Sequence, residues 1–175
     1  TPSNSSAASD VYKRQLYESL AGDLYRMALY TLGSQQDAED AVADTFAEAW
    51  KGIKNLREPE AFRSWMFRIL SARCKRQVAQ IVTRKKEIDL DSYYETAEEA
   101  MPETATRRAE LSEALGTLSP EERQIVLLSV VEGYTMREIA SMLEMPQGTV
   151  SSKLSRSLKK LRLQLQDTDG KEAAR

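Results

Sequence analysis

The sequence predicts an all-α fold: two small helical domains joined by an acidic flexible linker, the C-terminal one containing a helix-turn-helix. The first observation is that apolar residues recur every three or four positions, the spacing of one helix face. The second is that Pro and Gly stand at the ends of these stretches, where they start and stop helices. The third is that an acidic, polar segment divides the chain into a front and a rear half.

The ends of the chain are predicted to lie outside these domains. The first residues are small and polar, and Asp10–Gln15 resembles a translated sequencing adaptor. The expected parts are a disordered or non-native tail (1–15), a front domain (16–82), an acidic linker (83–106), a rear domain (107–166) and a disordered tail (167–175).

Composition limits the chemistry that the chain can perform. It has 175 residues, a net charge of −2, one cysteine (Cys74) and no histidine. Most catalytic and metal-binding constellations are therefore missing, and no Gly-rich phosphate loop is visible. No apolar run approaches the roughly 20 residues that span a membrane. We expect a cytoplasmic protein that is not an enzyme, has no cofactor and does not insert into a membrane.

The front domain begins with a helix near Leu16 that Gly33 ends, followed by a helix over residues 35–53. In the second helix the predicted apolar stripe contains six residues: Ala38, Val42, Phe46, Ala49, Trp50 and Ile53. Acids occupy the opposite face at spacings of three and four: Asp37, Asp40, Asp44 and Glu48. Two interpretations stay open: an ordinary solvated acidic face, or a docking face for a basic partner protein.

The third predicted helix is basic and aromatic. It follows Pro59 and carries no acid between Phe62 and Lys86, while cations recur along it and Phe62, Trp65 and Phe67 lie among them. Cations that follow phosphates and rings that stack on unpaired bases suit melted or single-stranded nucleic acid. The alternative is that the apolar residues form core and the cations only solvate the helix.

The predicted linker reverses the charge. Its acids, without an intervening cation, are Glu87, Asp89, Asp91, Glu95, Glu98, Glu99 and Glu103. The segment is either an inert flexible tether or a mimic of a nucleic-acid strand that occupies a basic channel in a partner.

The rear domain contains two local helix-start signals. Ser119 is an expected N-cap with Pro120 in the first helical position, and Ile125, Leu128 and Val131 are expected to point inward before Gly133 ends that helix. Thr135 is then expected to cap the next helix, with Glu138 completing a capping box. This arrangement places a short helix immediately before the turn at residues 145–148.

The helix after that turn is predicted to enter a DNA major groove. Val150, Leu154, Leu158, Leu161 and Leu165 form its apolar stripe, and no acid occurs between Pro146 and Gln166. A tight turn followed by a basic helix is typical of a helix-turn-helix. The expected contacts are Gln147, Thr149, Ser152, Lys153 and Arg156 near the helix start, where base edges are within reach, and Lys159 and Lys160 on phosphate. The alternative is an amphipathic helix with a solvated basic face.

Taken together, these motifs resemble bacterial RNA polymerase sigma factors of the extracytoplasmic-function type, within the sigma-70 family. The resemblance covers about Leu16–Leu165 and is carried by DAEDAVADTFAEAW (Asp37–Trp50), FRSWMFRI (Phe62–Ile69) and GTVSSKLSR (Gly148–Arg156). The chain departs from the usual pattern at Ala43, Ala72, Arg76, Ser151 and Lys153. The changes at Ala72 and Arg76 bear on recognition of the −10 element.

The resemblance implies a division of roles. The acidic helix would bind the clamp helices of the largest subunit of core RNA polymerase through Asp37, Asp40, Asp44, Glu48, Phe46 and Trp50. The basic helix would capture the melted −10 element of promoter DNA through Arg63, Trp65, Arg68, Arg73, Lys75 and Arg76. The rear helix would read the −35 element, the linker would thread through the polymerase, and an anti-sigma factor would be a further partner.

Promoter-specific transcription initiation is therefore the expected function. The alternative is a helix-turn-helix regulator that binds duplex DNA without polymerase, although such a protein would not need an acidic docking helix. A helical adaptor that binds only protein is a third possibility, which the acid-free rear helix disfavours.

Overall fold

The computed structural model describes residues 4–87 and 102–172, with side chains at 15, 17–83 and 109–166, and it is all-helical throughout these ranges. The elements are α1 (Asn4–Leu32), α2 (Gln35–Gly52), η1 (Ile53–Asn55), η2 (Pro59–Ala61), α3 (Phe62–Glu87), α4 (Pro102–Gly116), α5 (Pro120–Val126), η3 (Leu127–Val131), α6 (Met136–Leu143) and α7 (Gln147–Glu172). The all-α prediction is confirmed.

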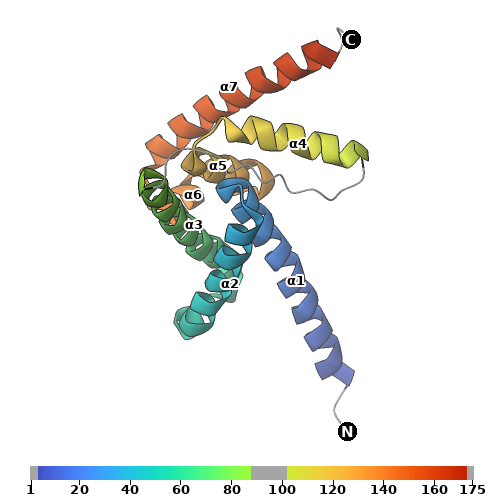
Figure 1. The fold of residues 1–175 in the computed structure, drawn as a ribbon. Helices are drawn as coiled ribbons and strands as arrows, with labels where there is room; N and C mark the ends of the chain where they lie inside the picture. The colour runs from blue at the N-terminus through green and yellow to red at the C-terminus, as the bar shows by residue number, and fades with distance from the viewer. Residues whose placement is uncertain (1–3, 88–101, 173–175) are drawn as a thin grey trace.

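Helices α1, α2 and α3 form the front half, in which each helix packs on the other two (Figure 1). Gly33 ends α1 with a φ of 73°, and the Ser34 hydroxyl caps α2 by accepting a hydrogen bond from the Asp37 N–H. Fully buried side chains from α1 and α3, among them Leu24 and Phe67, fill the space between the helices. The front half is thus a three-helix bundle that presents α2 and α3 side by side.

The stripe that α2 buries agrees with the predicted one only in part. Ala38 and Ala49 are buried as predicted, together with Ala41 and Thr45, whereas Trp50 is 81% exposed and Ile53 is 44% exposed. Small side chains let α2 lie close to its neighbours, so the large apolar residues remain on its flank. The prediction that the Trp50 ring faces the core is therefore wrong, because it lies on the surface.

Helices α4 to α7 form the rear half. The predicted helix starts are confirmed: Ser119 with Glu122, and Thr135 with Glu138, make complete capping boxes. After α5 the backbone widens into the π-helical turn η3, and Gly133 ends it with a φ of 74°. Val131 is half exposed, so the prediction that it points inward is wrong. The wider turn changes which side chains face the core.

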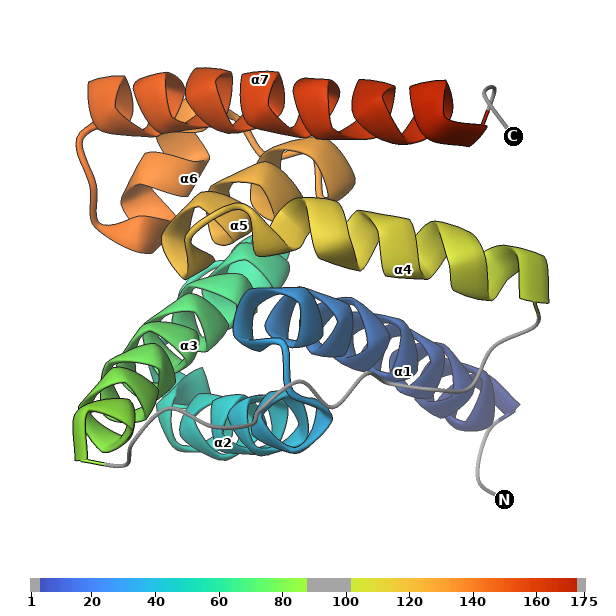
Figure 2. The same ribbon diagram turned by 45° about the horizontal axis from the view of Figure 1, so that its top comes forward.

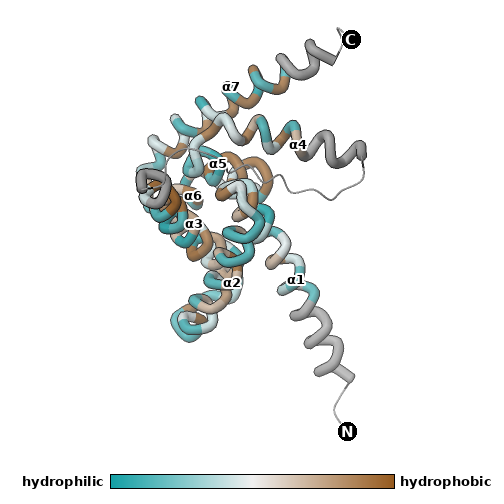
Figure 3. Tube along the Cα trace, viewed as in Figure 1, coloured by the Kyte–Doolittle hydropathy of each residue, from teal (hydrophilic) through white to brown (hydrophobic). Residues whose placement is uncertain are grey.

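The front and rear halves pack against each other. Helix α3 contacts α5 and α6, and α1 contacts α5, while α7 lies across the far side of the rear half (Figure 2). One apolar core continues through the boundary, since Phe67 and Leu70 of α3 belong to the same buried cluster as Leu128 and Ile139. Hydrophobic segments of α3, α5 and α6 accordingly gather around this boundary (Figure 3). Below, this boundary is called the seam.

Several element ends differ from the predicted boundaries. Helix α1 begins at Asn4 inside the predicted disordered tail, because residues 4–15 contain neither Gly nor Pro to stop a helix. Helix α3 continues to Glu87, α4 begins at Pro102, and α7 extends to Glu172. The flexible-linker prediction concerns mainly residues 88–101, which lie outside the described residues.

Candidate nucleic-acid and partner-binding surfaces

The helix-turn-helix is built as the local signals predict. The Thr135 hydroxyl accepts a hydrogen bond from the Glu138 N–H, and the Glu138 carboxylate accepts from the Thr135 N–H at 2.7 Å, which lowers the pKa of that carboxyl. Helix α6 ends at Glu144, which adopts the left-handed conformation with a φ of 54°. Only Met145 and Pro146 separate Glu144 from α7, so the chain reverses within a tight turn and fixes the start of α7 against α6.

Helix α7 docks through a stripe slightly rotated from the predicted one. Val150 is fully buried and Leu154 is half-buried, but Ser157 is also fully buried while Leu158 is 37% exposed. Leu165, also assigned to the stripe, is 42% exposed. The sequence pattern missed Ser157 because a polar residue carries no signal for burial.

The opposite side of α7 keeps most predicted DNA contacts accessible. Arg156 and Lys159 are exposed, and the Arg156 Nε donates to the carbonyl of Ser152 one turn earlier. Two lysines are held by acids of α5: Lys153 by Glu121, and Lys160 by Glu122 at 3.2 Å. The predicted set thus divides into accessible residues (Gln147, Ser152, Arg156 and Lys159), the half-buried Thr149, and the paired Lys153 and Lys160.

The pairing at the start of α5 also ties that helix to α7. The Glu122 carboxylate accepts a hydrogen bond from the Ser119 N–H at 2.9 Å and from the Lys160 ammonium. The hydrogen bond from the Ser119 backbone, followed by the nearby Lys160, holds the pKa of Glu122 below its ordinary value of 4.5. One carboxylate therefore caps α5 and fixes its orientation to the helix predicted to read DNA.

On α3, the predicted −10 residues lie on two sides. Arg63 and Arg68 face the seam, where the Arg63 Nη2 bonds to Asp23 of α1 at 2.9 Å and to Glu132 beyond η3. Arg68 pairs with Glu144 at 3.1 Å. Burial opposes the charge of Arg63, but its hydrogen bonds to Asp23 and Glu132 more than offset this, so its pKa is raised.

Arg73 and Arg76 of α3 turn toward α2. The Arg73 guanidinium donates through Nε and Nη2 to one Glu48 oxygen at 2.9 and 2.6 Å, and through Nη1 to Asp44 at 3.2 Å. Arg76 also approaches Glu48, at 3.5 Å. Lys75 is exposed. Residues assigned from the sequence to two separate surfaces, one for polymerase and one for DNA, are therefore partners in one ion-pair network.

The aromatic residues of α3 are unequally accessible. Trp65 is half-buried and its ring lies against Gly52, where an added Cβ would come within 3.2 Å of it. Phe62 is also half-buried, with its ring 6.1 Å from that of Trp65. Phe67 is fully buried and meets the Tyr134 ring edge-on across the seam at 5.9 Å. Phe62 and Trp65 thus keep some accessible ring surface, whereas Phe67 is part of the core.

On α2, the residues predicted to bind polymerase are spread over two flanks. Asp37 is half-buried and Asp40 exposed, while Asp44 and Glu48 face the α3 arginines. On the other flank the Phe46 ring lies tilted against the Tyr17 ring, with the ring centres 4.7 Å apart, and the Ala38–Ala49 stripe separates this pair from the acids. The exposed Trp50 lies beyond this pair toward the end of α2.

Arg123 was missed by the sequence analysis, and it joins three elements. Its Nε donates to the carbonyls of Leu115 and Leu118 at 2.8 and 3.1 Å, and its Nη1 donates to those of Tyr30 and Thr31 at the end of α1. Carbonyls at helix ends lack helical partners, so a guanidinium satisfies several at once. No sequence signal identifies this role, because Tyr30 and Arg123 lie far apart along the chain.

Two classes of site are missing from the described part of the chain. Its side chains include no group of three or more histidine, cysteine, aspartate or glutamate residues arranged to hold a metal ion. Within residues 4–87 and 102–172, no helix combines the length and apolar character needed to cross a membrane.

Comparison with known proteins agrees with the two-part organisation. Residues 16–82 match the family described as sigma-70 region 2, and residues 108–161 match sigma-70 region 4. The chain is 30% identical over 171 residues to the extracytoplasmic-function (ECF) RNA polymerase sigma factor SigL of Mycobacterium tuberculosis, covering 94% of this chain and 95% of SigL. It is 30% identical over 149 residues to SigV of Bacillus subtilis, covering 84% and 87%. Against SigE of Mycolicibacterium smegmatis it is 31% identical over 157 residues, covering 85% of this chain but 59% of SigE.

Solved structures share the fold. The sigma factor RpoE in complex with the anti-sigma factor NepR, from Bartonella quintana, superposes with a TM-score of 0.70 at 22% identity, covering 89% of this chain and 96% of that chain. CnrH in complex with the cytosolic domain of CnrY gives a TM-score of 0.62 at 24% identity, covering 89% and 87%. With both conserved regions matched and the SigL relative aligned over nearly its full length, the chain belongs to the extracytoplasmic-function group of sigma-70 family RNA polymerase sigma factors.

Proposed function

We propose that this chain binds core RNA polymerase and directs promoter-specific transcription initiation by recognising −10 and −35 elements. The observation that carries this conclusion is that one chain contains both sigma-70 regions. Region 2 includes α2, which is lined by acids, and region 4 includes the start of the exposed, basic α7. It would act as a non-catalytic specificity subunit, in the cytoplasm where the polymerase works. Residues 16–82 and 107–166 would be its two functional units, with 83–106 connecting them.

The −35 element would be read by α7. Arg156 is exposed and lies one turn from Ser152, near the helix start, where side chains reach base edges. Lys159 lies almost one turn further and would bind phosphate. Lys153 and Lys160 are held by Glu121 and Glu122, so they would reach DNA only by exchanging carboxylate for phosphate.

The melted −10 strand would lie along α3. Trp65 offers a half-exposed ring near the start of the helix, and Lys75 is an exposed cation further along. Arg63, Arg68, Arg73 and Arg76 have carboxylate partners, so each would have to leave its partner to contact phosphate. The residue types suit a single strand, because stacking and phosphate contacts need no duplex.

Core polymerase would dock on α2, with the exposed Asp40 and the half-buried Asp37 supplying negative charge and Trp50 a large exposed apolar surface. Asp44 and Glu48 would contribute partly through Arg73, and Phe46 would support the surface through its ring contact with Tyr17. The clamp helices of the largest polymerase subunit are therefore expected to present cations and apolar side chains to α2.

An anti-sigma factor is a further proposed partner. Support comes from the RpoE structure, in which a chain of the same fold is held by the anti-sigma factor NepR.

Co-purification with core polymerase separates this function from the alternative, a regulator that binds duplex DNA alone. We expect tagged chain to retain core polymerase and the variant with Asp40→Lys and Trp50→Ala to lose it while keeping its helical circular dichroism. If neither the tagged chain nor the variant retains polymerase, and the chain alone binds duplex DNA tightly and specifically, the alternative is supported instead.

A further inference from the structure

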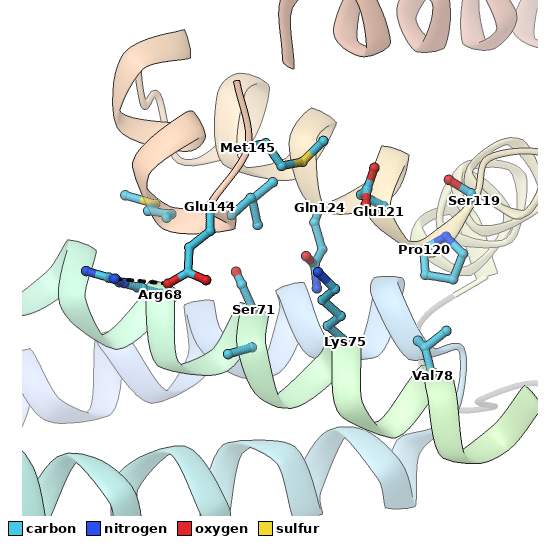
Figure 4. Close-up of a pocket in the computed structure, with 13 residues that line it drawn as sticks. Arg68, Ser71, Lys75, Val78, Ser119, Pro120, Glu121, Gln124, Glu144 and Met145 are labelled. Carbon is cyan, nitrogen blue, oxygen red and sulfur yellow. Dashed lines mark hydrogen bonds and ion pairs between the residues drawn. The ribbon is translucent and has the colours of Figure 1, made fainter. Parts of the chain in front are cut away.

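Two adjacent glutamates at the start of α5 hold two lysines of α7. Glu121 pairs with Lys153, and Glu122 pairs with Lys160 at 3.2 Å. Glu121 directly follows Pro120, and both line a cavity of about 290 Å³ between α3 and the rear half (Figure 4). The two lysines are about two helical turns apart, so they lie on the same flank of α7. The start of α5 therefore places negative charge beside the helix proposed to read DNA.

The Lys160–Glu122 pair is part of the local fold. The Glu122 carboxylate accepts a hydrogen bond from the Ser119 N–H at 2.9 Å and completes the capping box of α5. Its side chain is only 16% exposed, so it cannot turn into solvent without giving up the cap. A phosphate that approached Lys160 would meet this fixed carboxylate as a like charge. We therefore expect this pair to persist on DNA and to position α7 on α5.

Glu121 takes no part in the cap. Its side chain is 40% exposed and that of Lys153 is 29% exposed, so water partly screens their ion pair. The flexible stem of a lysine also turns readily between neighbouring acceptors. On α7, Lys153 directly follows Ser152, which belongs to the accessible side predicted to face DNA. Of the two lysines, Lys153 is thus the one that can pass from its carboxylate to a DNA phosphate.

We propose that Glu121 sets the affinity of the −35 contact by competing with a DNA phosphate for Lys153. This inference rests on the proposed role of α7. Carboxylate and phosphate carry like charge, so binding both to one ammonium is opposed by their repulsion. Phosphates are present in every sequence, so the competition lowers affinity for all duplexes alike. Lys153 is then a phosphate ligand and not a reader of bases.

Salt dependence distinguishes this exchange from a simple phosphate contact. A lysine that binds a phosphate releases a counterion from DNA, which adds about 0.9 to the slope of log affinity against log salt. When Lys153 leaves Glu121, the bared carboxylate attracts a cation from solution, and the net release of ions is close to zero. With glutamine at this position nothing offsets the release. The affinity of the variant should therefore fall more steeply as salt is added.

The test titrates the complete chain, alone and with core polymerase, against fluorescent short duplexes of random sequence at several salt concentrations. The test variant is Glu121→Gln, which preserves size and leaves the Ser119–Glu122 capping box in place. The matched control is Glu113→Gln, which makes the same charge change at an exposed position of α4. Both substitutions are also made together with Lys153→Gln. Urea unfolding shows that each variant keeps its fold.

At low salt we expect Glu121→Gln to bind about threefold or more tightly than Glu113→Gln, with a slope steeper by up to about 0.9. In the Lys153→Gln background the two substitutions should become equivalent. On a library randomised at the −35 element, Glu121→Gln should keep the wild-type preference, because the exchanged contact is to phosphate.

Equal affinities and slopes for Glu121→Gln and Glu113→Gln would overturn the competition. A gain that persists with Lys153→Gln would also overturn it, since the acid would then act on DNA without the lysine. An altered −35 preference would contradict the assignment of Lys153 to phosphate. If the wild-type chain binds no duplex DNA even with core polymerase, the proposed role of α7 fails and the competition with it. Tight wild-type binding that Glu121→Gln leaves unchanged overturns the competition alone.

Discussion

Glu48 is predicted from the sequence to face a partner, but in the structure it binds arginines of the same chain. Its spacing with Asp37, Asp40 and Asp44 predicts an acidic docking face, yet its carboxylate accepts two hydrogen bonds from Arg73 and approaches Arg76. A carboxylate that holds two arginines orients them and lowers its own availability to a partner. Asp40 is exposed and, among the described residues, carries no ion pair.

This contrast gives a prediction for polymerase binding. Asp40→Asn should weaken binding to core polymerase with little effect on stability, because it removes accessible charge only. Glu48→Gln should destabilise the fold by up to about 1 kcal/mol, the scale of a partly exposed ion pair. Titration with core polymerase and urea unfolding of both variants check this. A larger loss of polymerase affinity for Glu48→Gln than for Asp40→Asn would reverse the assignment.

A second prediction concerns Arg156 and Lys159 on α7. A lost base contact costs roughly 1–3 kcal/mol of discrimination, whereas a lost phosphate contact weakens all sequences alike and lowers the salt slope by about 0.9. Arg156→Ala should therefore relax preference at one or two −35 positions, and Lys159→Ala should reduce affinity with preference unchanged. Lys160 is a poorer phosphate probe, because its loss also removes the bond to Glu122.

The measurement is competitive binding of the complete chain with core polymerase to a library randomised at the −35 element, at two salt concentrations. If Arg156→Ala lowers affinity without any change in the preferred sequence, α7 clamps phosphate and does not read bases through this residue.

Helix α5 is held by hydrogen bonds at its first turn and by an ion pair to α7. Ser119 and Glu122 close its capping box, and Glu122 reaches Lys160 on α7. The pKa of Glu122 is lowered in the folded chain, so its contribution to stability is complete above the ordinary value of 4.5. That contribution is lost as the pH falls through the lower, folded-state pKa.

Stability against pH should therefore depend on this carboxylate. Glu122→Gln should lower the free energy of unfolding by about 1 kcal/mol at neutral pH, the scale of a charge-assisted hydrogen bond discounted for partial exposure. The deficit should vanish at pH values below the folded-state pKa, so the variant's stability falls less steeply on acidification. Urea unfolding between neutral pH and pH 3 measures this, with Glu113→Gln as the control. A deficit that persists at the acidic end would mean that packing, and not charge, is responsible.

The starts of helices could be predicted from the sequence where they depend on residues close together in the chain. The N-cap at Ser119 and the capping box of Thr135 with Glu138 follow from residues close together in the sequence, and both are confirmed. Trp50 and Leu158 were assigned to buried stripes and are exposed, because which flank of a helix is covered depends on its neighbours. The bonds from Arg63 to Glu132 and from Arg123 to Tyr30 join residues distant in sequence, so no spacing pattern could reveal them.

The whole molecule joins two sigma-70 regions through a shared core. Phe67 of α3 and Ile139 of α6 are fully buried in one cluster, although the family matches treat the regions separately. The surfaces proposed for DNA are accordingly of two kinds: α7 is largely accessible, while much of α3 is engaged by α2 or by the rear half. The proposed function therefore requires α3 to exchange internal partners for external ones.

Run-off transcription with purified core polymerase across a library of candidate promoters tests the central claim most directly. The account predicts that adding this chain produces transcripts from a subset of templates sharing −10 and −35 sequences. It also predicts that the variant with Asp40→Lys and Trp50→Ala does not produce them. Core polymerase that gives the same transcripts with and without the chain would contradict the claim that it is a promoter-specificity subunit.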